Sequence, residues 1–151
     1  AAEKEIIKMM GNLQSHSTSN PNSIAQYAST VGLNEYKKAE KNIETMVKEF
    51  SQRRDYMVDK INETAGLSSI KPGGAFYLMM NISELINKSY NGNKIDGSLS
   101  FADNLLDAEN VAVVPGIAFG ADNYVRLSYA NKMDNIKKGL DRISNFVKQL
   151  N

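Results

Sequence analysis

The stretch VAVVPGIAFGADNYVRLSYA, residues 111–130, contains two apolar runs joined by a turn between Gly116 and Gly120. Apolar runs that are separated by a glycine-bounded turn are typical of neighbouring β-strands. Side chains alternate between the two faces of a strand, so Arg126 lies on the face opposite Val125 and Leu127. The pattern therefore predicts a β-ribbon that presents one arginine away from its aliphatic face.

Arg126 has two interpretations that spacing alone leaves open. A guanidinium offers a planar fork of donors that fits a carboxylate bidentately, and a strand restricts how far that fork can move, so Arg126 is a candidate carboxylate-binding residue. The alternative is an arginine that pairs with a neighbouring acid or lies along the sheet surface, an arrangement that is common and weak.

Composition excludes several classes of function. Lysine and arginine total 18 against 17 for aspartate and glutamate, giving a net charge of +1, so no electrostatic attraction to nucleic acid or anionic membrane is expected. The chain has no cysteine and one histidine, which excludes thiolate metal sites and makes a histidine-based metal cluster or catalytic triad improbable; no metal site is expected. No apolar run reaches the roughly 20 residues of a membrane span and no signal peptide is evident at the start, so a cytoplasmic location is expected.

The first third of the chain is predicted to be helical. A short helical pattern covers residues 2–10, a polar loop covers 15–21, and a short helix covers 24–32. Residues 34–63 then carry apolar side chains at three- and four-residue spacing, which predicts one helix of roughly 45 Å. That length suggests a helix shared by two domains, whereas an interrupted stripe without leucine argues against a coiled coil.

The remainder predicts a mixture of strands and helices. A strand at 75–81 follows Gly73 and Gly74, for which a positive φ angle, a close approach to the backbone and a flexible strand entry all remain open. A polar loop at 87–98 precedes a helix capped by Ser100, with Asp103 in the position of a capping box. An amphipathic helix that starts near residues 131–134 ends the chain. The expected fold class is α+β, with a small, mainly antiparallel sheet covered by helices.

The ordered motifs along the chain resemble one family. These motifs are Phe50-x-x-Arg53-Arg54-Asp55, residues 71–77, Asn81-Ile82-Ser83, residues 111–120 and residues 124–130. Their order and spacing are similar to the C-terminal portion of pyridoxal-phosphate-dependent aminotransferases of the aspartate aminotransferase type. A Ser-Asn-Pro-x-Ser-x-x-Gln-like segment near residues 15–26 extends the resemblance over nearly the whole chain.

The resemblance implies a fold-type-I homodimer in which a small domain closes over substrate held by a large cofactor domain. Residues 1–33 would be the tail end of the large domain, 34–64 the long interdomain helix, and 65–151 the C-terminal small domain. The expected partners are an amino acid or 2-oxo acid substrate, the N-terminal large domain and a second subunit.

Site residues follow from the same resemblance. Arg126 aligns with the family arginine that binds the substrate α-carboxylate, while Gly74 and Phe76 belong to the segment lining the substrate side of the cleft. Phe76 is equally compatible with a core aromatic on a strand. Ser19 and Asn20 are expected to approach the active site of the dimer partner.

Two further positions have expectations of their own. The single histidine, His16, is expected to be a polar loop residue. Relatives often have a small polar residue where this chain has Ile117, which casts doubt on any hydrogen bond expected there.

The family's chemistry needs a lysine that forms a Schiff base with pyridoxal 5'-phosphate. No lysine here lies in the family's Ser-Lys-x-x-x-x-x-Gly-x-Arg-x-Gly context, which the resemblance places just before Ala1. The expectation is therefore a transaminase as the parent protein, and an inactive fragment that contributes no catalytic or cofactor-binding residue. Alternatives are a non-catalytic ligand-binding or regulatory module, and an aminotransferase for aromatic amino acids, histidinol phosphate or alanine.

Overall fold

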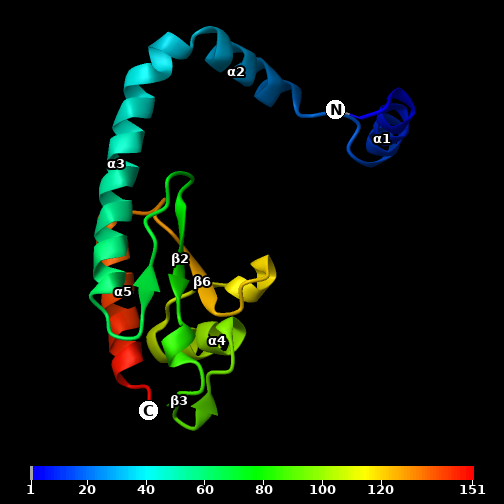
Figure 1. The fold of residues 1–151 in the computed structure, drawn as a ribbon. Helices are drawn as coiled ribbons and strands as arrows, with labels where there is room; N and C mark the ends of the chain where they lie inside the picture. Colours follow the sequence, from blue (N-terminus) through cyan, green and yellow to red (C-terminus); the bar gives the residue numbers. More distant parts are fainter. Residues whose placement is uncertain (1) are drawn as a thin grey trace. The chain divides into compact units, whose positions relative to one another are not determined.

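The computed structural model describes residues 2–151, which separate into two compact units with their boundary between Thr45 and Met46 (Figure 1). The division falls inside one continuous helix, α3 (Tyr36–Asn62). Each unit is described by itself.

The N-terminal unit is entirely helical and has no buried side chain in α1 (Lys4–Ser17) or α2 (Ser23–Asn34). The Asn22 side chain caps α2 by accepting hydrogen bonds from the backbone N–H groups of Ile24 and Ala25 at 3.0 and 3.1 Å. The prediction that α1 ends near residue 10 was wrong. The hydroxyls of Ser15 and Ser17 donate to backbone carbonyls three and four residues earlier, so these polar residues continue the helix.

Helix α3 has 27 residues, about 40 Å, close to the predicted span. Its buried side chains, Met57, Val58 and Ile61, all lie near its C-terminal end. Tyr36, Ile43, Met46 and Val47, in the first half of the helix, are exposed. The apolar stripe is therefore used for packing only where the helix meets the sheet.

The larger unit is built on a four-stranded antiparallel sheet with strand order β1-β2-β6-β5. The strands are β1 (Ser68–Ser69), β2 (Tyr77–Asn81), β5 (Val114–Pro115) and β6 (Tyr124–Ser128). In the central pair, Leu78 lies opposite Leu127 and Met80 opposite Val125, and these residues face the core. The predicted α+β class with a small antiparallel sheet is confirmed.

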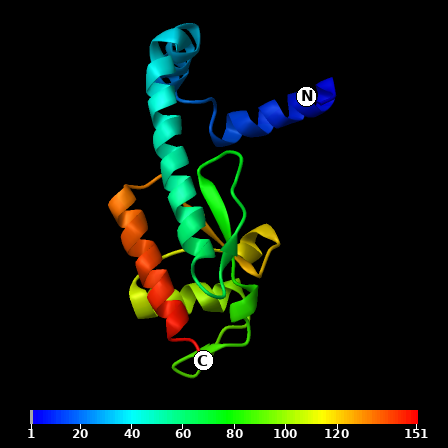
Figure 2. The ribbon, with the colours of Figure 1, turned by 60° about the vertical axis from the view of Figure 1, so that its left-hand side comes forward.

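Helices cover one face of this sheet (Figure 2). Helix α5 (Met133–Lys148) runs alongside the C-terminal half of α3, and α4 (Ser98–Glu109) crosses below them. The core between helices and sheet includes Phe101, Phe146 and Ile143, each almost fully buried. The predicted stripe of α5 is confirmed, since Ile136, Leu140, Ile143 and Val147 are buried.

Three further short elements lie between residues 83 and 94, and two of them replace part of the predicted loop at 87–98. Strands β3 (Ser89–Tyr90) and β4 (Asn93–Lys94) form a hairpin, whose Asn91-Gly92 turn has φ angles of 49° and 84°. The backbone of Asn151 pairs with Ser89 and fastens the chain's end to this hairpin. A 3-10 helix, η1 (Ser83–Leu85), buries Leu85.

Helix α4 begins three residues earlier than predicted, and Ser100 is not its N-cap. The N-cap is Gly97, and the Ser100 hydroxyl reaches back to accept the N–H groups of Asp96 and Gly97 at 2.9 and 3.2 Å. Asp103 makes no such contact within residues 2–151. None of the helices in this described range is long and apolar enough to cross a lipid bilayer.

Gly116 provides a test of this packing. A Cβ atom added there would lie 2.2 Å from the carbonyl oxygens of Ala121 and Tyr124, which are backbone atoms and cannot rotate away. We expect Gly116→Ala to lower the free energy of unfolding by at least about 2 kcal/mol. In the control Gly139→Ala, on α5, the added methyl meets nothing within 4 Å and removes a helix glycine, so stability should rise by about 0.5–1 kcal/mol. Urea denaturation measures both, and equal midpoints for the two variants would contradict the packing of this turn.

Candidate functional site

Arg126 lies in the middle of β6 on the sheet face opposite the core, as predicted. Its register neighbours are Met79 on β2 and Val114 on β5, whereas Val125 beside it is fully buried. The guanidinium carbon lies 4.3 Å from the ring centre of Tyr77 and 4.5 Å from that of Phe119. Within residues 2–151 no ion pair involves Arg126, so the predicted alternative of a neighbouring acid does not apply there.

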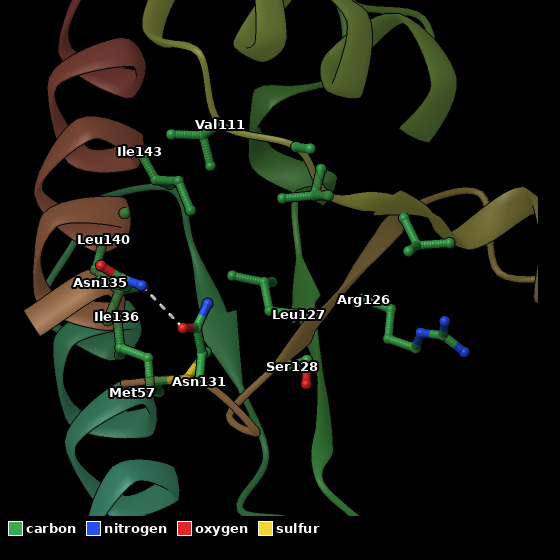
Figure 3. A pocket seen from close by; sticks show the side chains of 14 residues that line it. Met57, Val111, Arg126, Leu127, Ser128, Asn131, Asn135, Ile136, Leu140 and Ile143 are labelled. Atoms are coloured by element: carbon green, nitrogen blue, oxygen red, sulfur yellow. Dashed lines mark hydrogen bonds between the residues drawn. The ribbon is translucent and has the colours of Figure 1, made fainter. Parts of the chain in front are cut away.

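An apolar cavity of about 240 Å³ lies behind the strand that carries Arg126. Its wall includes Val111, Leu127, Ile136 and Ile143, so it is lined mainly by side chains of the core face. Figure 3 shows the Arg126 side chain turned away from these residues. Arg126 is among the residues that line the cavity, but its guanidinium points toward the open face of the sheet.

Phe119 is the last residue of a 3-10 helix, η2 (Gly116–Phe119), which follows β5. Gly120 ends that helix with a φ of 74°, a left-handed conformation that glycine adopts without a steric cost. The N–H of Ala121 then donates to the Gly116 carbonyl at 3.0 Å and closes the turn. The turn therefore has a defined backbone path that returns directly to β6.

A buried serine fastens this turn to α4. The Asp122 carboxylate accepts hydrogen bonds from the Ser98 backbone N–H at 2.9 Å and from the Ser98 hydroxyl at 2.7 Å. The same hydroxyl accepts the N–H of Ile117 at 3.0 Å. Ile117 thus makes a hydrogen bond through its backbone, while its side chain is exposed. The Ser98 hydrogen bonds hold the pKa of Asp122 below its usual value of 3.8, because they favour the ionised carboxylate.

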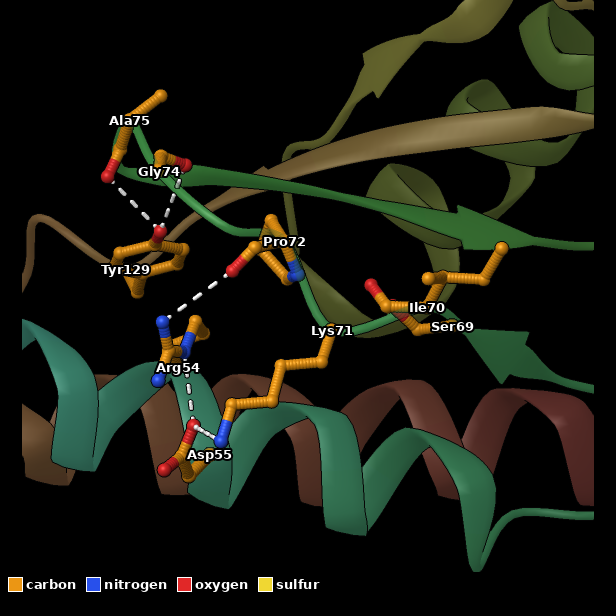
Figure 4. Close-up of polar contacts among 9 residues, drawn as sticks. All are labelled: Arg54, Asp55, Ser69, Ile70, Lys71, Pro72, Gly74, Ala75 and Tyr129. Atoms are coloured by element: carbon orange, nitrogen blue, oxygen red, sulfur yellow. Dashed lines mark hydrogen bonds and ion pairs between the residues drawn. The ribbon is translucent and has the colours of Figure 1, made fainter.

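The loop at 71–76 is fastened to α3 and β6 by polar contacts (Figure 4). Arg54 donates to Asp55 at 2.8 Å and to the Pro72 carbonyl at 3.3 Å, and Lys71 pairs with Asp55 at 2.9 Å. Hydrogen bonds from Arg54 and Lys71 lower the pKa of Asp55. The Tyr129 hydroxyl donates to the Ala75 carbonyl at 2.9 Å. This loop is therefore an ordered part of the unit.

Gly73 and Gly74 are not needed for a left-handed backbone conformation. Neither Gly73 nor Gly74 has a positive φ, and it is Ala75 that adopts one, 60°. A Cβ atom on Gly74 would meet nothing within 4 Å, so this unit alone does not require a glycine there. The left-handed Ala75 also explains why β2 starts at Tyr77, two residues later than predicted.

Phe76 packs on Tyr77, and the Tyr77 ring in turn contacts Arg126. The Phe76 and Tyr77 ring centres are 4.2 Å apart, and the Tyr77 ring contacts the guanidinium. Because Phe76 is 40% exposed, its interpretation as a core aromatic was wrong. Its predicted role toward substrate stays a prediction.

The predicted dimer-site residues belong to the N-terminal unit. Ser19 has a φ of 60° and donates its N–H to the Gln14 carbonyl, just after α1 ends. Asn20 follows it and is exposed. His16 is exposed in the last turn of α1, so its placement in a loop was wrong.

A sequence model of the family described as "Aminotransferase class I and II" matches residues 1–143. The chain belongs to the class I and II aminotransferases. It is 41% identical over 149 residues to the aspartate aminotransferase of Bacillus subtilis (strain 168), covering 99% of this chain and 36% of that enzyme. It is 35% identical over 144 residues to the aspartate/prephenate aminotransferase of Nitrosomonas europaea, covering 94% and 36%.

Solved structures agree with this assignment. The aspartate aminotransferase from Rhizobium meliloti superimposes with a TM-score of 0.84 at 35% identity, over 100% of this chain and 37% of that one. The aromatic aminotransferase from Pyrococcus horikoshii gives a TM-score of 0.79 at 33% identity, over 98% and 37%. This aminotransferase chain therefore spans a little over a third of the length of these relatives, and its resemblance to the aspartate type is confirmed.

The family depends in general on pyridoxal phosphate, whose aldehyde is bound by a lysine. The side chains placed around Arg126 in this aminotransferase chain are aromatic and aliphatic: Tyr77, Phe119, Met79 and Val114. None of these four is a lysine, and Lys71 is engaged with Asp55. The residues at this site therefore do not by themselves fit the cofactor, whereas the Arg126 guanidinium has the donor geometry that suits a carboxylate.

Sequence reasoning missed the aromatic residues that contact Arg126. Tyr77 could have been found, because alternation along β2 places it on the same face as Met79, opposite Arg126. Phe119 could not, because its position depends on the three-dimensional path of the turn and on the Ser98–Asp122 contact.

The Ser98–Asp122 contact predicts a specific dependence of stability on pH. Because the folded pKa of Asp122 lies below 3.8, its contribution is complete above that value and is lost as the pH falls through the folded pKa. We expect the difference in free energy of unfolding between wild type and Asp122→Asn to be largest near neutral pH and to shrink below pH 3.8. Introducing Asp122→Asn into a Ser98→Ala background should give a difference much less sensitive to pH. The same pH dependence in both backgrounds, measured by urea denaturation, would contradict this assignment.

Proposed function

We propose that this chain is the C-terminal part of a pyridoxal-phosphate-dependent aminotransferase of the aspartate type, and that Arg126 binds the α-carboxylate of its amino acid and 2-oxo acid substrates. The observation that carries the proposal is the set of groups that surround the Arg126 guanidinium. Its guanidinium faces away from the core, has no acidic partner in the described range, and lies between two aromatic rings. An unpaired arginine in such a position is suited to an external carboxylate.

Transamination makes two demands on a carboxylate-binding group. The amino acid and the 2-oxo acid share the α-carboxylate, so one arginine serves both halves of the reaction. Two parallel N–H···O contacts also fix the orientation of the substrate, which aligns the bond to be broken with the reacting centre. The cofactor, when bound, supplies the electron sink for the substrate's Cα carbanion.

The proposal also covers the rest of the enzyme and four other residues of this chain. We propose that the lysine that binds the cofactor belongs to a large domain outside these 151 residues, and that the whole enzyme is a homodimer in which Ser19 and Asn20 approach the partner's site. Phe76 and Gly74 are proposed to line the substrate cleft. Similarity to aspartate and aspartate/prephenate aminotransferases favours an acidic substrate.

A non-catalytic carboxylate-binding module is the competing function, because the arginine is present and the lysine motif is not. The two are distinguished by the reading frame upstream of residue 1. A cofactor-lysine motif there supports the enzyme, and an unrelated domain or a stop codon supports the module.

Arg126 is tested in the full-length enzyme. We expect Arg126→Gln to lower kcat/KM by roughly 100- to 1000-fold for both the amino acid and the 2-oxo acid, because a bidentate charged contact is lost. The control Arg142→Gln removes an arginine on α5 that donates to the Glu109 carbonyl, and should leave KM unchanged. Steady-state kinetics measures both variants. An Arg126→Gln enzyme with wild-type kcat/KM would exclude the proposed role.

The 151-residue chain alone is expected to lack covalent cofactor binding. Incubation with pyridoxal phosphate and borohydride, followed by peptide mass spectrometry, should show no single preferred lysine, because none lies among the side chains placed around Arg126. One defined adduct together with transamination activity would show that the chain is a complete catalyst.

A further inference from the structure

We infer that Tyr77 and Phe119 form an aromatic clamp that fixes the direction of the Arg126 guanidinium, and that both are positioning residues for carboxylate binding. The inference rests on the proposed function of Arg126 and adds two residues to it. Both rings lie within 4.5 Å of the guanidinium carbon. These distances are well inside the range of about 6 Å over which a ring face attracts a cation.

The two rings come from the two sides of β6. Tyr77 belongs to β2, and Phe119 belongs to η2, which follows β5; β2 and β5 are the strands that flank β6. A guanidinium keeps its five N–H donors in its own plane. Contact with ring faces therefore leaves the N–H edge free for a carboxylate. Consistent with this geometry, Arg126 donates no hydrogen bond to a side chain or turn carbonyl in the part of the chain the structure covers.

The segment that carries each ring is held by its own contacts. Tyr77 sits in the β2–β6 ladder opposite Ser128, and its ring packs on Phe76 at 4.2 Å. Phe119 is held by the turn that Ser98 and Asp122 fasten to α4. Gly116 packs against backbone oxygens at the start of the same turn. The Tyr77 ring is thus held by its strand and by Phe76, and the backbone that carries Phe119 is held by the turn, although the Phe119 ring itself is half exposed.

The clamp has a distinctive kinetic consequence. An arginine side chain loses conformational entropy when it is fixed, and the rings ensure that this loss occurs on folding and not on substrate binding. Removing a ring should therefore weaken the binding of every ligand that has the shared carboxylate. Chemistry after binding should change little, so KM rises and kcat stays nearly constant.

The test uses the full-length holoenzyme with two pairs of variants. Phe119→Leu and Tyr77→Leu remove a ring, whereas Phe119→Tyr and Tyr77→Phe keep it. We expect each leucine variant to raise KM for the amino acid and for the 2-oxo acid by the same factor, roughly three- to tenfold, with kcat within about twofold of wild type. The ring-keeping variants should stay within about twofold of wild type in both constants.

Binding without turnover gives a second measurement. The Kd for maleate, an unreactive dicarboxylate, should rise by the same factor as KM in the leucine variants. Tyr56→Leu is the matched control, because it removes a ring that contacts Lys137 at 5.7 Å elsewhere in the same unit. Its KM and maleate Kd should be those of wild type. Thermal midpoints of all variants show whether a change in binding reflects loss of folding.

A double mutant separates the clamp from a general structural role. If Phe119 acts through Arg126, then Phe119→Leu should have no further effect on maleate binding in an Arg126→Gln enzyme. Leucine variants with unchanged KM, beside an Arg126→Gln enzyme that has lost activity, would overturn the clamp and leave the proposed function standing. A KM change for one substrate only, or equal losses in Tyr77→Phe and Tyr77→Leu, would also overturn it. An unaffected Arg126→Gln enzyme would instead overturn the proposed function, and the clamp with it.

Discussion

The pairing of β2 with β6 is the constraint on which the site depends. Antiparallel register places Leu78 against Leu127 and Met80 against Val125 on the core side, so the intervening residues must lie on the open side. A shift of one residue in this pairing would bury Arg126 and expose the aliphatic side chains. The free energy of core burial therefore also determines the direction of the guanidinium. Fold stability and site geometry are two consequences of one register.

The turn between β5 and β6 also links the stability of the fold to the geometry of the site. Ser98 is fully buried, and its hydroxyl both donates to Asp122, which follows η2, and accepts from Ile117 within η2. A buried polar group of this kind is costly if any partner is lost, which makes the arrangement specific. Phe119 lies between the two fastened points. The position of an exposed ring is thus set by a contact in the interior.

Much of this arrangement could be predicted from the sequence because it follows from periodicity. Repeating patterns define the stripe of α5, the span of α3 and the two faces of β6. Such a pattern can be recognised even when the first and last residues of the element are misplaced. Short elements have no such redundancy, which is why β1 and the β3–β4 hairpin were missed. Local chemistry misled the predictions in two places: serines continued α1, and Ser100 capped α4 from inside the helix. The left-handed residue of the 71–76 loop is Ala75 and not a glycine, which sequence preference would not suggest.

In the role proposed for Arg126, its guanidinium alone would not account for the affinity of a carboxylate ligand. An ion pair at an exposed surface contributes between about 0 and 1 kcal/mol, because water competes for both partners and two side chains must be fixed. The rings reduce the second of these costs by holding the arginine, but they leave its N–H edge open to water. Exclusion of water from that edge needs a surface that covers the open face of the sheet, and the α-helices of this unit cover only the other face (Figure 2). In the proposed role of Arg126, the strength of carboxylate binding would therefore depend on a surface that closes over β6, whereas its direction would follow from β6, Tyr77 and Phe119.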